Sequence, residues 1–184
     1  MNKEAFYYNV KDSLFHGKLS QSQVEGMEAI INASSIVSTN ELAYILATIY
    51  HETAKTMQPI EEYGKGYNRT YGHKVKLNGK PYNNTDNIFF GRGFVQLTWY
   101  DNYEKMGKII GEDLINHPEL CLTISVATKI CYAGMIGGLF TGKRLSDFIN
   151  DTQTDFINAR RIINRLDCAE LISGYADKYI IALK

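Results

Sequence analysis

Residues 44–63 read YILATIYHETAKTMQPIEEY, an apolar segment that runs directly into a histidine and a glutamate. Upstream, Ser38 and Glu41 have the spacing of a capping box, which predicts that a helix begins there. Apolar side chains cover almost every side of this helix, a pattern typical of a helix buried at the centre of a domain. Pro59 predicts that the helix ends just before it.

Glu52 lies at the C-terminal end of this predicted helix and continues its apolar stripe. It stands three residues after Ile49 and seven after Ile45, so we expect it on a buried face. A partly buried carboxyl can hold a proton near neutral pH, as a general acid must. Position alone slightly favours the alternative, a glutamate that caps the helix end or forms an ion pair there.

Glycosidases need a second carboxyl group on the other side of the scissile bond. On one straight helix, Glu52 and Glu61 would lie on opposite faces, about 13 Å apart along the axis. A chain reversal near Pro59 would let Glu61 return toward Glu52, and Glu62 is the competing candidate for the second role. The alternative is a solvated loop carboxylate.

His51 and Glu52 begin like the zinc-binding HExxH motif, but position 55, where the second histidine would stand, is a lysine. The remaining histidines are scattered, so we predict neither a metal site nor a cofactor. His51 is interpreted as a packing or supporting residue.

The three cysteines are expected to be buried, reduced thiols, in keeping with a reducing compartment. Cys121 and Cys131 are predicted on one helix, about 15 Å apart and too far to form a disulfide. Cys168 is the third.

Length and charge narrow the class of protein. The 184 residues fit a single domain, residues 1–184, and we expect a monomer. The charges of twenty basic and twenty acidic residues cancel to a formal net charge of zero. This charge balance does not suggest electrostatic binding of nucleic acid. No apolar run is long enough for a signal peptide or for stable insertion into a membrane.

Periodicity predicts a mainly α class with a small β lobe. Further helical patterns occupy residues 3–15, 20–33, 102–110, 118–135, 144–150, 154–163 and 168–183. Between the helices, the Asn78–Gly79 pair predicts a β-hairpin. Residues 88–98 are interpreted as strand, turn and strand, with Gln96 and Thr98 on one face of the second strand. That face could bind sugar hydroxyls, or it could be the solvated side of an edge strand.

Two segments together resemble glycoside hydrolase family 19, which contains plant-type chitinases and many bacteriophage endolysins. They are YHETAKTMQPIEEYGKG at 50–66 and FFGRGFVQLTWYDNY at 89–103. GKLSQSQVEGMEAI at 17–30 and NARRIINRLDCAELISGY at 158–175 look most similar to the endolysin branch, and the resemblance covers nearly the whole chain.

The resemblance implies a lysozyme-like helical domain whose β lobe flanks the cleft. It implies Glu52 as general acid and a carboxylate of the following loop, for which we choose Glu61, as general base. It also implies a set of substrate-binding residues, Gln96, Thr98, Asn102, Tyr103 and Asn164. Arg160 and Arg161 are candidates to hold the carboxylates by ion pairing.

The implied function is hydrolysis, with inversion, of β-1,4 bonds between N-acetylmuramic acid and N-acetylglucosamine in peptidoglycan glycan strands. Two alternatives stay open, a chitinase and an inactive wall-binding protein on the same scaffold. The disulfide set of the plant enzymes is missing, which argues against chitin. As a lysin, the protein would accumulate in the cytoplasm of the host bacterium and need a holin for release to the periplasm and cell wall.

Overall fold

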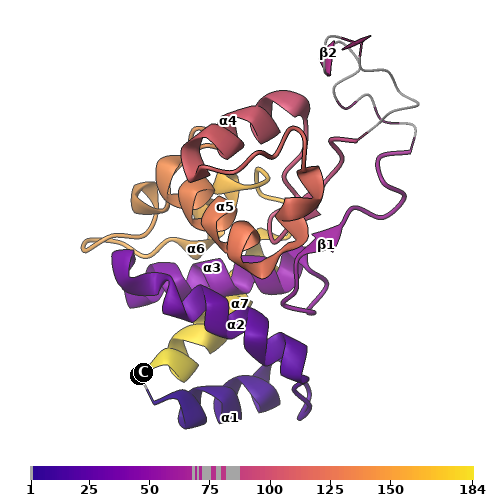
Figure 1. The fold of residues 1–184 in the computed structure, drawn as a ribbon. Coiled ribbons are helices and arrows are strands. Elements are labelled where there is room, and N and C mark those ends of the chain that lie inside the picture. Colours follow the sequence, from indigo (N-terminus) through magenta and orange to yellow (C-terminus); the bar gives the residue numbers. More distant parts are fainter. Residues whose placement is uncertain (1, 68, 70, 72–75, 78–79, 82–87) are drawn as a thin grey trace. The chain divides into compact units, whose positions relative to one another are not determined.

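A computed structural model describes residues 2–67, 69, 71, 76–77, 80–81 and 88–184, and it shows a mainly helical chain, as predicted (Figure 1). The chain forms two compact units, one made of Met1–Gln58 with Gly134–Lys184 and the other of Pro59–Ala133. None of the described helices is both long enough and apolar enough to span a membrane.

The first unit is built from α-helices and short 3₁₀ segments. They are α1 (Lys3–Ser13), α2 (Gln21–Asn32), η1 (Ser34–Ile36), α3 (Thr39–Glu52), η4 (Leu145–Asp147), α6 (Phe156–Ala159), η5 (Arg160–Ile162) and α7 (Ala169–Leu183). The second unit contains β1 (Ile60–Glu61), β2 (Lys76–Leu77), β3 (Lys80–Pro81), β4 (Arg92–Gly93), α4 (Tyr100–Ile110) and η3 (Pro118–Leu122). Helix α5 (Ile124–Gly137) begins in the second unit and ends in the first.

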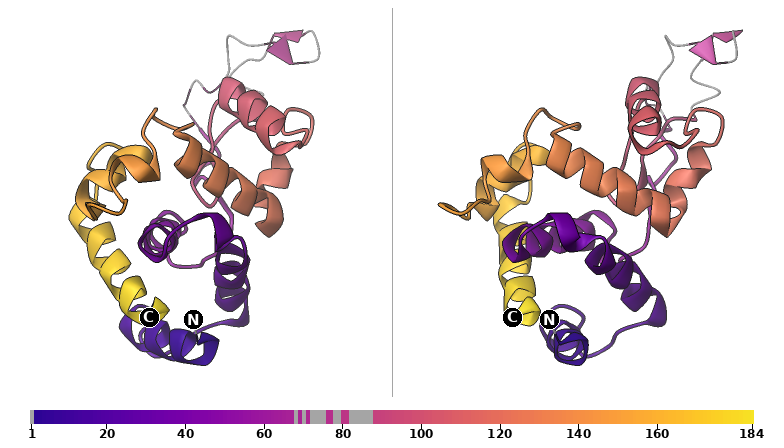
Figure 2. Two further views of the ribbon diagram at one scale, coloured as in Figure 1. Left: turned by 90° about the vertical axis from the view of Figure 1, so that its left-hand side faces the viewer. Right: turned by 60° about the vertical axis from the view of Figure 1, so that its left-hand side comes forward.

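Helix α3 is the buried centre of the first unit, as the sequence predicts. Its N-terminus carries the capping box of Ser38 and Glu41, and every residue from Leu42 to Tyr50 is buried. It packs against α2 and α7, and Figure 2 shows it enclosed by these two helices and α1. Its last residue, Glu52, is therefore carried on a helix that the core holds along its whole length.

The end of α3 differs from the prediction, because the helix stops at Glu52 rather than just before Pro59. The Thr53 hydroxyl donates to the Ile49 carbonyl at 2.7 Å and accepts the Met57 N–H at 3.1 Å. This side chain closes the helix end, and the backbone then reverses. Three of the next residues have left-handed backbone angles: Ala54 (φ 49°), Lys55 (φ 69°) and Met57 (φ 54°).

The segment after Glu52 is fastened to α2. The Gln23 side chain donates to the Lys55 carbonyl at 3.0 Å, and the Gln58 side chain donates to the Ser22 carbonyl. Gly26 lies directly under this segment, since a Cβ atom there would be 1.7 Å from the Met57 carbonyl oxygen. Helix α2 therefore positions the chain that leaves the candidate acid.

We expect Gly26→Ala to lower the free energy of unfolding by about 3 kcal/mol, because a buried backbone segment would have to move to admit the methyl group. The matched control is Gly174→Ala in α7, where nothing lies within 4 Å of the added carbon. That change should stabilise the protein by roughly 0.5–1 kcal/mol. Urea unfolding measures both, and a wild-type midpoint for Gly26→Ala would contradict the contact.

In the second unit, β1 pairs antiparallel with β4, so that Ile60 faces Gly93 and Glu61 faces Arg92. Strands β2 and β3 also pair antiparallel, in the register that the predicted hairpin requires. The Asn78–Gly79 turn of that hairpin lies outside the described residues.

The prediction of a strand at FVQLT is wrong. Residues 94–96 form a tight turn instead, in which Gln96 has a left-handed φ of 54° and Leu97 bridges back to Arg92. Phe94, Val95 and Leu97 are all buried, so the two-faced alternation of a strand is lost. Gly93, with φ 94°, permits the reversal that the hydrophobic pattern alone does not reveal.

Three predicted helices are shorter than expected. The segment 118–135 is divided into η3 and α5 at Thr123, which puts Cys121 and Cys131 on separate elements. Both are buried as predicted, and burial raises the pKa of each thiol to about 12. Cys168 is exposed, contrary to the prediction, because it precedes α7 at the surface. The patterns at 144–150 and 154–163 shrink to η4 and to α6 with η5.

Candidate active site

In the first unit, Glu52 forms an ion pair with a buried arginine. Its Oε1 accepts a hydrogen bond from Nη1 of Arg160 at 2.5 Å. The side chain of Arg160 is only 2% exposed and that of Glu52 is 16% exposed. Arg160 is itself fixed by a hydrogen bond from Nε to the Asp167 carbonyl at 2.8 Å. The carboxyl group therefore has a fixed direction and a narrow opening to solvent.

Only one of the two predicted arginines reaches this carboxylate. Arg161 is exposed, and its Nε donates to Asn158 Oδ1 at 3.1 Å. The short α6–η5 turn that carries both arginines begins at Asp155, whose side chain caps it through the Asn158 N–H. Asn164 follows as an exposed residue, and its backbone N–H donates to the Arg160 carbonyl at 3.0 Å.

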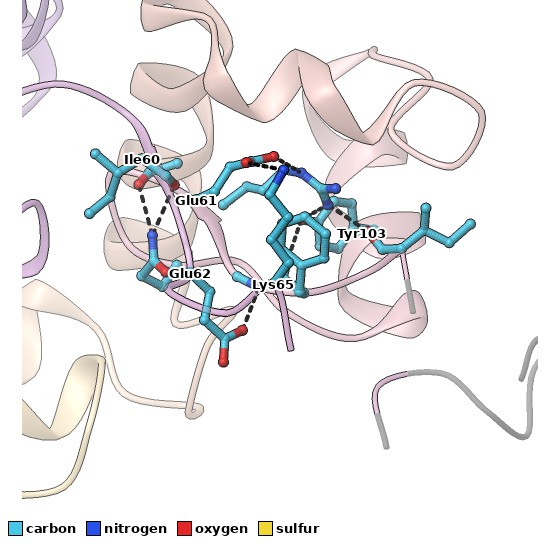
Figure 3. Close-up of polar contacts among 11 residues, drawn as sticks. Ile60, Glu61, Glu62, Lys65 and Tyr103 are labelled. Carbon is cyan, nitrogen blue, oxygen red and sulfur yellow. Dashed lines mark hydrogen bonds and ion pairs between the residues drawn. The ribbon is translucent and has the colours of Figure 1, made fainter. Parts of the chain in front are cut away.

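In the second unit, Glu61 lies between two cations (Figure 3). Its carboxylate is 3.1 Å from Nζ of Lys65 and 3.6 Å from Nε of Arg92, its partner across the β1–β4 pair. The Glu61 side chain is 32% exposed, whereas that of Arg92 is 7% exposed. The carboxylate therefore has a positive charge beside it on the Lys65 side and on the Arg92 side, and part of it stays open to solvent.

Arg92 is held in place by the interior of this unit. Its Nη1 donates to the Ile88 carbonyl at 2.5 Å and to the Tyr103 hydroxyl at 3.1 Å, and its guanidinium lies 3.7 Å from the Phe90 ring centre. Tyr103, predicted to bind substrate, is fully buried, and its hydroxyl donates to the Phe90 carbonyl at 2.7 Å. Burial raises the pKa of Tyr103. Any contribution of Tyr103 to the site therefore passes through Arg92.

Glu62 has different partners from Glu61. Its carboxylate accepts the Gly91 N–H at 3.0 Å and the Tyr71 hydroxyl at 3.1 Å. Burial, together with the negative charge of Glu62, raises the pKa of Tyr71. Figure 3 shows the side chains of Glu61 and Glu62 leaving the strand toward separate sets of partners. Glu62 thus serves to join β1 to the segment before β4.

The Gln96 amide belongs to the same β element. Its Nε2 donates to the Ile60 carbonyl at 3.1 Å and to the Gly93 carbonyl at 3.3 Å, which ties β1 to β4. A Cβ atom at Gly91 would be 2.8 Å from Gln96 Oε1 and 3.4 Å from Glu62 Oε2, so the bare glycine backbone lets these two groups approach. Gln96 is half-buried and lies beside Glu62, although the strand predicted to position it does not form.

Two other predicted binding residues lie at the start of α4. Thr98 is half-buried, and its carbonyl accepts the side-chain amide of the exposed Asn102 at 2.9 Å. Trp99, which was not predicted as a site residue, is 44% exposed and packs edge to face on Tyr71 with ring centroids 5.1 Å apart. Tryptophan combines a large apolar ring with an N–H donor and is enriched at binding interfaces. Its place directly after FVQLT was the available signal.

His51 occupies the last turn of α3, half-buried, with its carbonyl bonded to the Ala54 N–H. Among the described residues, no group of three or more histidine, cysteine, aspartate or glutamate side chains could hold a metal ion. Each unit thus supplies one carboxylate held by a buried arginine, the chemical equipment for acid and base catalysis.

Comparison with known proteins identifies one family whose model matches this chain. The family model described as chitinase class I, of glycoside hydrolase family 19, matches residues 25–135. Endochitinase 1 of Theobroma cacao is 38% identical over 94 residues, 45% of this chain and 28% of that protein. An acidic endochitinase of Petunia hybrida is 34% identical over 96 residues, 50% of this chain and 34% of that protein. The chain thus spans about a third of the length of these relatives.

Solved structures show the same fold. Chitinase C of Streptomyces griseus superposes with a TM-score of 0.71 at 18% identity, over 99% of this chain and 76% of that one. The class IV chitinase of Zea mays gives 0.57 at 18% identity, over 96% and 93%. This likeness confirms the predicted fold class. Because the family model covers more than half of the sequence, the chain belongs to glycoside hydrolase family 19.

Proposed function

We propose that this protein hydrolyses β-1,4 bonds in glycans that contain N-acetylglucosamine, and that its substrate is peptidoglycan. The observation that carries the proposal is the Glu52–Arg160 pair, a carboxyl on the end of a buried helix with its direction fixed and a narrow solvent opening. Family membership supports the reaction type. The similarity of several segments to phage endolysins favours peptidoglycan over chitin.

In this proposal Glu52 is the general acid that protonates the departing glycosidic oxygen. Arg160 holds the carboxyl in place, and its positive charge stabilises the carboxylate left behind after proton transfer. Because Arg160 is almost completely buried, this charge is weakly screened by water.

Glu61 is the proposed general base. It removes a proton from the water that attacks the anomeric carbon on the opposite face of the sugar, which inverts the configuration there. Lys65 and Arg92 lie beside the Glu61 carboxylate and fix its direction. An inverting reaction requires the two carboxyls at about 6.5–9.5 Å when the substrate is bound. Gln96, Thr98, Asn102 and Asn164 would contact the sugars, with Trp99 as a stacking surface.

Chitin is the second candidate substrate, because the similar plant proteins are endochitinases and the fold matches two chitinases. If the protein is a phage endolysin, it would be made in the cytoplasm of the bacterial host and would reach the cell wall after a holin opens the membrane. An inactive wall-binding protein is the remaining alternative.

Digestion of purified sacculi and of chito-oligosaccharides, followed by mass spectrometry, separates these possibilities. We expect soluble muropeptides with muramic acid at the reducing end, and proton NMR should show the α-anomer first. Products from chito-oligosaccharides alone would identify a chitinase instead. Binding to sacculi without release of fragments would contradict the proposed activity.

A further inference from the structure

Two buried hydroxyl groups lie on the face of α3 that ends at Glu52. Tyr44, Thr48 and Glu52 are spaced four residues apart, so their side chains follow one another along the helix. Tyr44 and Thr48 are both fully buried. Within the part of the chain that the structure describes, neither hydroxyl has a hydrogen-bond partner of good geometry.

Tyr44 is linked by geometry to the Glu52–Arg160 pair, because it lies on the Glu52 face of α3 and its ring packs on the segment that carries Arg160. Burial raises the pKa of Tyr44, the charge of Arg160 and the nearby Thr48 hydroxyl oppose this rise, and the charge of Glu52 adds to it. The ring is held independently, because it stacks on Phe156 with centroids 5.7 Å apart and planes at 14°. Phe156 stands four residues before Arg160, so one short segment packs the ring and carries the arginine.

The same helix offers a contrast in Tyr50. That residue is buried as well, but its hydroxyl donates to the Leu14 carbonyl, which explains why a tyrosine is useful there. A buried hydroxyl without such a partner destabilises a protein relative to a plain hydrocarbon. Phenylalanine at position 44 and valine at position 48 would therefore fold at least as well, and folding alone does not account for these hydroxyls.

We propose that Tyr44 is a positioning residue for Glu52 that acts through Arg160, with Thr48 as its neighbour. The phenolic oxygen presents its negative end to the guanidinium and keeps Arg160 aligned with the Glu52 carboxyl while that group loses its proton. This inference rests on the proposed role of Glu52 as the acid. It concerns alignment only, since Tyr44 is fully buried and cannot touch a substrate.

Tyr44→Phe tests the inference, with Tyr50→Phe as the matched control on the same helix. For Tyr44→Phe we expect kcat to fall about three- to tenfold, because Arg160 would lose the dipole of the phenolic oxygen, with KM unchanged. Its melting temperature should equal or exceed that of the wild type. For Tyr50→Phe we expect the reverse, a lower melting temperature and an unchanged kcat per folded molecule. Thr48→Val should behave as a milder form of Tyr44→Phe.

A wild-type kcat for Tyr44→Phe overturns the inference, and so does a loss of kcat that comes with the same drop in melting temperature as Tyr50→Phe. If the wild-type protein hydrolyses no glycan, the proposed function fails separately. The inference is then judged by a double-mutant cycle of Tyr44→Phe with Glu52→Gln in urea unfolding. Non-additive changes support the link between Tyr44 and Glu52, and additive changes overturn it.

Discussion

Glu52→Gln is expected to reduce kcat by about 10²- to 10⁴-fold, the usual contribution of a general acid. Glutamine has nearly the same shape, and its side-chain oxygen can still accept the hydrogen bond from Arg160. The substitution thus removes the transferable proton while it preserves the partner and the helix end. Binding should survive, so KM should change little.

Release of soluble muropeptides from sacculi measures the effect, at enzyme concentrations corrected for folded protein. Glu170→Gln is the control, because Glu170 is an exposed glutamate in the first turn of α7. It should retain the wild-type rate and melting temperature. If Glu52→Gln also retains the wild-type rate, Glu52 is not the acid and the proposed mechanism is wrong.

Glu61→Gln is expected to produce a loss of similar size, about 10²- to 10⁴-fold in kcat, because the attacking water would lose its base. Glu62, the residue that directly follows β1, provides the comparison. Glu62 accepts hydrogen bonds from the Gly91 N–H and the Tyr71 hydroxyl, contacts that a glutamine oxygen can retain in part. Glu62→Gln should therefore lower the melting temperature modestly and reduce kcat less than tenfold.

The two variants are best assayed side by side on one preparation of sacculi, with circular dichroism as the measure of folding. If Glu62→Gln loses more kcat than Glu61→Gln, Glu62 is the general base and Glu61 has the structural role. If both variants are as active as the wild type, neither Glu61 nor Glu62 is the general base.

Local signals in the sequence predicted the helical framework well. The capping box at Ser38 is present, and the helix that it opens begins at the expected residue. The nearly all-round apolar pattern identified α3 as the buried helix. These features depend on residues within one or two turns of each other, so the sequence contains all that is needed to predict them.

Prediction failed where a residue's backbone or a single side chain overrides the pattern. The FVQLT segment alternates like a strand, but the left-handed angles at Gly93 and Gln96 close it into a turn. Thr53 ends α3 through its own hydroxyl well before Pro59 does. Hydrophobic periodicity reports which side chains prefer to be buried, and it contains no information about these reversals.

The sequence by itself determined that Glu52 lies on a buried helix and that Glu61 and Glu62 follow after a break at Pro59. Only the tertiary structure decided that Arg160, 108 residues further on, pairs with Glu52 while Arg161 points to Asn158. It likewise separated Glu61, beside Arg92, from Glu62, beside Tyr71. Pairings over such separations depend on how helices and strands pack together, and the spacing of residues along the chain does not encode them.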